Sequence, residues 1–176
     1  MRTAVIFQSK YGTTKRYAEY IARQLNCDLF ETKAVKNTDL SVYDAFIFGG
    51  GLYAGGIAGS SFVKQNWNII IQKKIALFTV GLSDPAKTDY SQIISKAFLP
   101  AQRERIKFFH LRGGIDYSEL GFIHKSMMAM LNKHIESIAN KGEATDEDKL
   151  FLETYGKKVN FVDFTGADEI IKYISS

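Results

Sequence analysis

Apolar and polar positions follow two periods along this chain, one typical of buried strands and the other of amphipathic helices. Continuous apolar runs predict strands buried on both faces over Thr3–Ser9 and Asp44–Gly50, and further strands are expected over Lys74–Gly81 and Arg105–Gly113. The segment Cys27–Lys33 alternates like a more exposed strand. Helical spacing of apolar residues predicts helices over Thr13–Leu25, Ala58–Gln72, Tyr90–Leu99, Glu119–Asn140, Asp146–Tyr155 and Ala167–Ile174. The stretch Val159–Phe164 is expected to be extended, without a place in the sheet.

The alternation of strands and helices predicts an α/β fold. Right-handed crossovers between such strands give a parallel sheet with helices on both faces. Five strands with a phosphate-type loop after the first favour the strand order 2-1-3-4-5. Ligands of such sheets bind beyond the carboxyl ends of the strands, so the loops after strands 1, 3 and 4 are the places to look for a site.

Composition is that of a soluble globular protein. With 176 residues, two prolines and no low-complexity stretch, residues 1–176 are expected to form a single domain. The lone Cys27 cannot form an internal disulfide, which fits a reducing cytosol. The N-terminal apolar run breaks at Gln8, too early for a signal peptide, and no apolar stretch reaches the ~18 residues of a membrane span. We expect a cytoplasmic protein.

The net charge of +4 favours anionic partners such as phosphates, acidic small molecules or anionic lipid headgroups. No run of five or six like charges is present, so no nucleic-acid partner is expected. The alternative is a mixed-sign solvated surface with a slight basic excess.

The junction of the first predicted strand and helix combines three hydroxyl side chains with one glycine. A helix start leaves about four backbone N–H groups without internal partners and carries roughly half a positive charge. Such a loop suits a phosphate dianion, although Ser and Thr also cap ordinary helices. The candidate binding residues here are Ser9, Lys10, Tyr11, Gly12, Thr13 and Thr14.

Two further loops follow strands 3 and 4. A glycine cluster over Gly49–Gly56 allows unusual backbone and close approach of a flat ligand, against which Tyr53 could stack. Its loose Gly-x-Gly-x-x-Ala pattern is discounted as a dinucleotide fingerprint, because that motif belongs after the first strand. The alternative is a tight turn with Tyr53 half exposed. The candidate ring-binding residues are Gly51, Leu52, Tyr53, Ala54 and Gly55 in one loop and Gly81, Leu82, Ser83 and Asp84 in the other.

Other classes of protein with a similar fold lack their required residues here. A phosphorelay receiver needs an aspartate at the end of strand 3, where this chain has glycine. The P-loop pattern Gly-x-x-x-x-Gly-Lys-Ser/Thr and the hydrolase pattern Gly-x-Ser-x-Gly are both absent.

Together these loops resemble those of the flavodoxin family. Residues 9–14 are similar to the flavodoxin phosphate loop, and Gly51–Gly55 and Gly81–Asp84 stand where flavodoxins hold the flavin ring. The resemblance implies a flavodoxin-like three-layer sandwich that binds flavin mononucleotide (FMN). It also implies a redox function, with the flavin ring between Tyr53 and the loop 81–86.

Differences from the electron-carrier flavodoxins indicate a subfamily. Those carriers are generally acidic and tend to have an aromatic residue after strand 4, whereas this chain is basic and has Leu82-Ser83-Asp84-Pro85 there. The chain is more similar to the flavodoxin-domain menaquinone-dependent protoporphyrinogen IX dehydrogenases of heme biosynthesis. The shared patterns are Gly50–Gly55, Gly113–Tyr117, a Met-rich basic helix and a tail from Thr145 to Phe164.

This resemblance implies an FMN-dependent oxidoreductase that passes electrons from protoporphyrinogen IX to menaquinone. Its implied partners are a small-molecule redox substrate or quinone, with peripheral contact at the inner face of a membrane. The alternative is an electron carrier that accepts electrons from a reductase and has a redox partner protein. No catalytic side chain is assigned, because transfer at a flavin ring need not use one.

The helix near 122–138 has an apolar stripe rich in methionine, which most often fills a core. The alternative is an adaptable apolar surface, rimmed by cations, that meets a membrane, a quinone or a flat tetrapyrrole. His124, Lys125, Lys133 and His134 are expected to project away from this stripe. The three histidines lack metal-ligand spacing, so no metal is expected.

Overall fold

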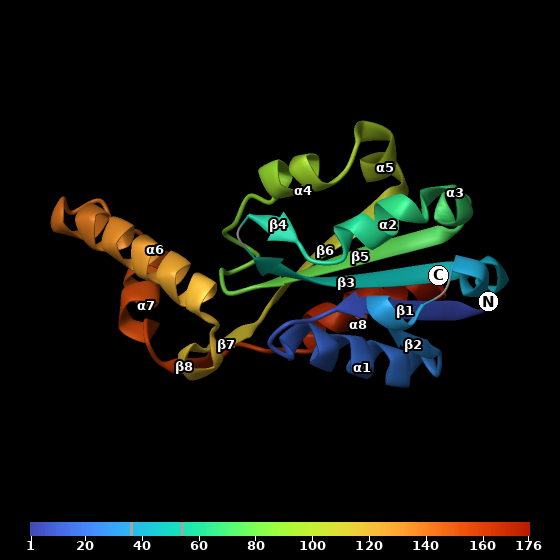
Figure 1. Ribbon diagram of the computed structural model, residues 1–176, viewed down its shortest axis with the longest axis horizontal. Helices are drawn as coiled ribbons and strands as arrows, with labels where there is room; N and C mark the ends of the chain where they lie inside the picture. The colour runs from blue at the N-terminus through green and yellow to red at the C-terminus, as the bar shows by residue number, and fades with distance from the viewer. Residues whose placement is uncertain (36, 54) are drawn as a thin grey trace.

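Five parallel strands form the centre of the protein. The structure is a computed structural model that describes residues 1–35, 37–53 and 55–176, without the side chains at 37–39. The strands run in the order β2-β1-β3-β5-β6, which confirms the predicted order 2-1-3-4-5 (Figure 1). Val5 of the central β1 lies opposite Leu29 on one side and Ile47 on the other. The strands are β1 (Thr3–Gln8), β2 (Asp28–Glu31), β3 (Ala45–Tyr53), β5 (Lys74–Gly81) and β6 (Ile106–Arg112).

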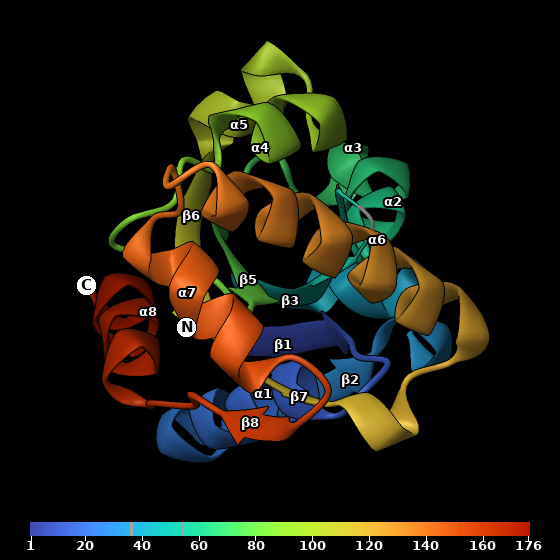
Figure 2. The same ribbon diagram turned by 90° about the vertical axis from the view of Figure 1, so that its left-hand side faces the viewer.

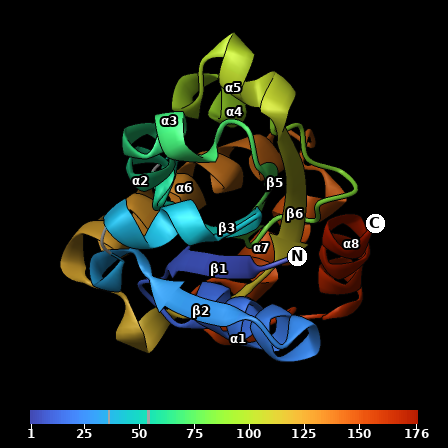
Figure 3. The ribbon, with the colours of Figure 1, turned by 90° about the vertical axis from the view of Figure 1, so that its right-hand side faces the viewer.

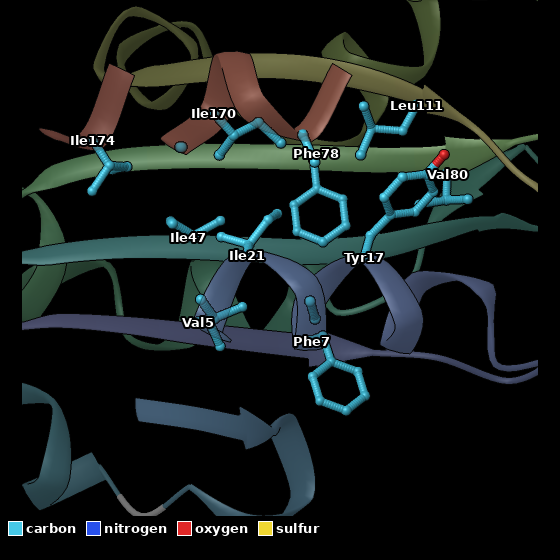
Figure 4. Close-up of a cluster of buried hydrophobic side chains, with 14 of the residues drawn as sticks. Val5, Phe7, Tyr17, Ile21, Ile47, Phe78, Val80, Leu111, Ile170 and Ile174 are labelled. Atoms are coloured by element: carbon cyan, nitrogen blue, oxygen red, sulfur yellow. The ribbon is translucent and has the colours of Figure 1, made fainter. Parts of the chain in front are cut away.

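Helices cover both faces of this sheet and give the three-layer arrangement that the alternating pattern predicts (Figures 1 and 3). The helices α1 (Thr13–Leu25) and α8 (Thr165–Ser175) bury their apolar sides on one face, where Tyr17 and Phe78 are fully buried (Figure 4). A second core on the other face includes Phe46 and Leu77. Its helices are α2 (Ser60–Gln65), α3 (Trp67–Ile70), α4 (Ser91–Ala97) and α5 (Pro100–Arg105).

One predicted helix is divided in the structure, and another is followed directly by a helix that was not predicted. The predicted helix Ala58–Gln72 breaks at Asn66, whose side-chain amide donates to the carbonyl oxygen of Phe62 at 2.8 Å. The helix predicted to stop before Pro100 does end at Ala97, but a new helix then begins at the proline itself. Proline is favoured at a first helical position because the N–H that it lacks would have no partner there. The sequence analysis missed this second helix.

The glycine cluster Gly49–Gly56 is expected from its sequence to end a strand at Gly50 and to continue as a loop, and for residues 51–53 the expected loop is wrong. The strand β3 continues to Tyr53 and turns back into β4 (Gly56–Ile57), which pairs with it in antiparallel fashion. Gly49 and Gly50 belong to the strand, and their role is close packing: a Cβ at Gly49 would collide with the Phe78 ring. Gly55 has a φ of +73°, as the turn requires.

A smaller unit extends past the carboxyl ends of the strands (Figures 1 and 2). Strands β7 (Gly114–Asp116) and β8 (Lys158–Asn160) pair in antiparallel fashion, so part of the extended segment Val159–Phe164 lies outside the main sheet. Between them stand α6 (Phe122–Asn140) and α7 (Asp146–Thr154). Short 3₁₀ turns complete the chain: Thr32–Ala34, Asn37–Val42 and Tyr117–Glu119. Among the described residues, no helix is both long enough and apolar enough to cross a membrane.

Candidate functional site

The loop between β1 and α1 has the geometry of an anion-binding turn. Gly12 adopts a left-handed conformation with a φ of +88°, and its N–H donates to Ser9 Oγ at 3.1 Å. The helix therefore begins at Thr13 directly after a glycine. The N-cap residue is a glycine and has no side chain to cap the helix, and the Ser9 hydroxyl oxygen accepts the N–H of that glycine. The first N–H groups of α1 are left to face a ligand.

One backbone N–H group of this loop meets the hydroxyl oxygen of Tyr53. The N–H of Lys10 donates to Tyr53 Oη at 3.4 Å. Burial raises the pKa of Tyr53 above its ordinary value, and the hydrogen bond from Lys10 acts against this rise. The phenol is therefore neutral at pH 7, and its oxygen is an acceptor for the loop.

A cavity of about 140 Å³ lies where the ends of β1, β3, β5 and β6 meet. Seven of the fifteen predicted residues line it: Tyr11, Thr13, Thr14, Leu52, Tyr53, Gly81 and Leu82. Thr14 is buried, and the hydroxyl of Thr13 donates to the carbonyl oxygen of Gly114 at 3.5 Å. The three predicted loops therefore do converge on one place, as the sheet topology requires.

Three more of the predicted residues lie around the phosphate-type loop without lining this cavity. Lys10 and Gly12 face an adjoining open groove of about 950 Å³, whose other cations include Arg16 and Lys158. Ser9 points back into its own loop, toward Gly12.

The other predicted residues that the structure describes do not line the cavity. Gly51 is buried, and a Cβ at that position would stand 2.5 Å from Tyr53 Oη. Gly55 is exposed in the turn before β4, and Ala54 lies outside the described residues. Ser83 is exposed and lines a neighbouring cavity. Asp84 accepts the Ala86 N–H at 3.0 Å and thus shapes its own loop.

The sequence analysis did not assign the other half of the cavity wall. Gly113 and Gly114 could have been found, because they follow the last parallel strand and must lie at the same edge of the sheet. His124 could not, because it comes from α6, whose docking depends on tertiary contacts. The unassigned lining residues are Val80, Gly113, Gly114, Ile115, Leu120, His124, Met127 and Met128.

The expectation that His124 projects away from the apolar stripe of α6 is wrong, because His124 lines the cavity together with Met127 and Met128 of that stripe. Its Nδ1 lies 2.6 Å from the hydroxyl oxygen of Tyr11, and its ring stacks on Tyr53 with 5.5 Å between centroids and 9° between planes. The N–H of Gly121 also donates to the Tyr11 hydroxyl, at 3.4 Å. Residues from the phosphate-type loop, β3 and α6 thus form one aromatic cluster.

The expectation that the apolar stripe of α6 fills a core is also wrong. Phe122 is 86% exposed, Ile123 72% and Met130 70%, while Ile135 is buried. The alternative that the sequence left open, an exposed apolar face with Lys125 and Lys133 beside it, is the one observed. This face adjoins the cavity, because Met127 and Met128 line it.

Arg112 lines a second cavity, of about 240 Å³, next to the first. Leu82 and Ile115 line both cavities. Its Nε donates to the carbonyl oxygen of Leu82 at 2.9 Å, and its Nη2 lies 3.5 Å from Glu147 Oε1 on α7. The guanidinium also stands 4.1 Å from the centroid of the Phe161 ring. Arg112 therefore fixes the loop after β5.

The far end of that loop is held by His110. Its Nδ1 lies 2.7 Å from Thr79 Oγ1, and its ring stacks on Tyr90 at 3.6 Å with 6° between planes. Burial lowers the pKa of His110 to about 4, so this imidazole is neutral at pH 7. Among the described residues, no group of three His, Cys, Asp or Glu side chains is placed to hold a metal ion.

Comparisons with known proteins found one family model and several solved structures that are similar to this chain. A family model described as a flavodoxin domain matches residues 4–140. A flavodoxin 2 from Bacillus cereus aligns at 21% identity with a TM-score of 0.49, covering 64% of this chain and 84% of its own. A flavoprotein from Lactobacillus acidophilus, solved in complex with FMN, aligns at 18% identity with a TM-score of 0.43. This alignment covers 63% of this chain and 91% of the flavoprotein. Curated protein sequences give no match. Because the family model spans well over half of its residues, this chain belongs to the flavodoxin domain family.

Proposed function

We propose that this protein binds FMN at the cavity between β1, β3, β5 and β6 and has a redox function. The observation that carries the proposal is the loop 9–14, where the Lys10 N–H already donates to an oxygen atom, Tyr53 Oη, and the left-handed Gly12 leads into the start of α1. A phosphate oxygen suits this donor better, because it carries charge. Thr13 and Thr14 add hydroxyl donors beside it.

The cavity walls suit the rest of a flavin. Leu52 and Leu82 supply apolar surface from two different loops, and Gly81 and Gly113 leave the backbone accessible to a flat ring. The flavin, when bound, supplies hydride and electron transfer, and the protein supplies binding, orientation and exclusion of water. Arg112 and His110 hold the loop that carries Leu82 from its two ends.

Cofactor identity tests this proposal. The loop 9–14 offers one phosphate site, so FMN should bind in preference to FAD, which carries a pyrophosphate. The purified protein is denatured, and the released chromophore is identified by chromatography; the stripped protein is then reconstituted with FMN, FAD and riboflavin. Release of FAD, or no flavin binding after reconstitution, would contradict the proposal.

The finer proposal is that the bound flavin oxidises protoporphyrinogen IX and passes electrons to menaquinone. Its support is the sequence resemblance in Gly50–Gly55 and Gly113–Tyr117, together with an exposed apolar face beside the cavity where a large apolar substrate could approach. The alternative is an electron carrier. The FMN-loaded protein is assayed for protoporphyrinogen oxidation with a menaquinone analogue. Absence of that turnover, with rapid reduction by a flavodoxin reductase, would favour the carrier.

We further propose that the exposed face of α6 makes peripheral contact with an anionic membrane. Phe122, Ile123 and Met130 supply apolar side chains, and Lys125 and Lys133 supply positive charge. Replacement of both lysines by Glu should lower the affinity for phosphatidylglycerol vesicles at low salt. The same substitution should lower that affinity less at 0.1 M salt, where charges more than about 10 Å apart are screened.

The matched control reverses two exposed lysines elsewhere, Lys33 and Lys172, and should leave vesicle binding close to that of the unmodified protein. The absorbance spectrum of bound FMN should be unchanged in both variants. If the Lys125 and Lys133 variant binds vesicles as well as the unmodified protein does, the face of α6 is an ordinary solvated surface.

A further inference from the structure

Tyr53 stands in the place that a phosphate would take. Its hydroxyl accepts the Lys10 N–H, a donor of the phosphate-type loop, at 3.4 Å. Gly51 makes this position possible, because a Cβ there would stand 2.5 Å from Tyr53 Oη. A ligand that needs this N–H group must therefore displace the phenol.

The ring of Tyr53 is held from two other segments as well. It stacks on His124 of α6 and meets the Tyr11 ring edge-on, with 5.9 Å between centroids and 71° between planes. The cavity that these rings border has a volume of about 140 Å³. Pockets for drug-sized ligands usually measure about 300–1,000 Å³, so this cavity taken alone is small for a flavin, and movement of a lining side chain would enlarge it.

We propose that Tyr53 gates the phosphate site: an anionic ligand displaces its hydroxyl from the loop, and the displacement is transmitted through His124 to α6. This inference rests on the proposed function. A phosphate oxygen displaces the neutral phenol because a charge-assisted hydrogen bond is roughly twice as strong as a neutral one and the start of α1 favours negative charge. Riboflavin has no phosphate and lacks this means of opening the site. Tyr53 therefore contributes to selection between the two flavins.

The link to α6 follows from the shared contacts. When Tyr53 leaves the loop, its stacking on His124 changes, and His124 is bonded to the Tyr11 hydroxyl in the same loop. Phosphate occupancy and the position of the first turn of α6 are then linked, and each must influence the other.

The test replaces Tyr53 by Phe, which keeps the ring and removes the oxygen that occupies the loop. FMN and inorganic phosphate should each bind about two- to tenfold more tightly, the size of one net hydrogen bond, whereas riboflavin affinity should change less than about twofold. The matched control is Tyr20→Phe, because the Tyr20 hydroxyl bonds Asp168 at 2.7 Å, away from the loop. It should leave all three affinities unchanged. Thermal melts of each variant check that the fold is retained.

A second measurement uses the unmodified protein. Inorganic phosphate alone should shift the imidazole NMR signals of His124, and should shift them much less in Tyr53→Phe. The signals of His134, exposed on the same helix, serve as the internal control. A phosphate titration that leaves His124 unmoved would overturn the link to α6.

The possible results distinguish a failure of the gating proposal from a failure of the proposed FMN binding. If FMN binds and Tyr53→Phe binds it no more tightly, or gains equally for riboflavin, the gate is wrong and the proposed function stands. If no flavin binds but phosphate binds more tightly to Tyr53→Phe, the proposed function fails and the gate stands. If no flavin binds and phosphate affinity is also unchanged, both are wrong.

Discussion

Replacement of Thr14 by Val is the sharpest test of where the phosphate binds. Thr14 is the second residue of α1, it is buried, and its side chain lines the cavity. Valine has nearly the same shape, so the change removes a hydroxyl donor and little else. Thr13 offers a weaker test, because its hydroxyl already donates to the Gly114 carbonyl oxygen.

The expected loss can be worked out from the contact that the hydroxyl would make. A hydrogen bond to a charged group contributes about 1.5–3 kcal/mol, which corresponds to about a 10- to 150-fold rise in the FMN dissociation constant for Thr14→Val. Thr13→Val should cost less, because phosphate must first replace the bond to Gly114. The double variant should lose at least about tenfold. Riboflavin affinity should change much less in all three.

The assay is titration of the stripped protein with each flavin, followed by the quenching of flavin fluorescence. Thr3→Val is the matched control, because Thr3 is also buried but lies at the opposite end of β1. Equal losses for FMN and riboflavin, or less than about a threefold loss of FMN affinity, would place the phosphate elsewhere.

Three further changes test the scaffold around the site. Gly49→Ala should lower the free energy of unfolding by about 1–3 kcal/mol, measured by urea denaturation, because the new Cβ would displace the buried Phe78 ring. An unchanged urea midpoint would mean that the core accommodates the added methyl group without a loss of stability. Arg112→Gln should weaken FMN and riboflavin binding by similar factors, because it releases the loop that carries Leu82; a loss confined to FMN would refute this role. Burial lowers the pKa of His110 from 6.5 to about 4, so between these values the unfolded chain binds the proton more readily and stability falls as the pH falls. This linkage is worth about 2–3 kcal/mol over that range, and denaturation curves of His110→Phe should show a correspondingly weaker pH dependence.

Much of the site was predictable because the order of strands and helices follows from short sequence patterns. Buried strands gave continuous apolar runs, and their alternation with helices predicts the strand order that the structure has. Parallel strands end at one edge of a sheet, so the loops after β1, β3 and β5 had to converge there. Gly113 and Gly114 follow β6, which ends at the same edge of the sheet, so their place in the site was equally predictable from the sequence although they were not assigned to it.

The glycines after the middle of β3 show where local patterns mislead. The glycine cluster predicts that the strand ends at Gly50, but β3 continues to Tyr53 because Gly51 pairs with Val80 of β5 and Tyr53 pairs with Gly56 of β4. This pairing comes from a neighbouring strand and a returning chain. Neither is visible within a short window of sequence.

The sequence by itself determined the helical period of α6 and the identity of the residues on it, since both depend on neighbours within a few positions. The tertiary structure decided which way the helix faces. His124 enters the site through its contact with Tyr11, 113 positions earlier in the chain, and Met130 faces solvent. A helical period fixes which side chains share a face, but only contacts with distant segments fix whether that face is buried, because burial is a property of the whole packed chain.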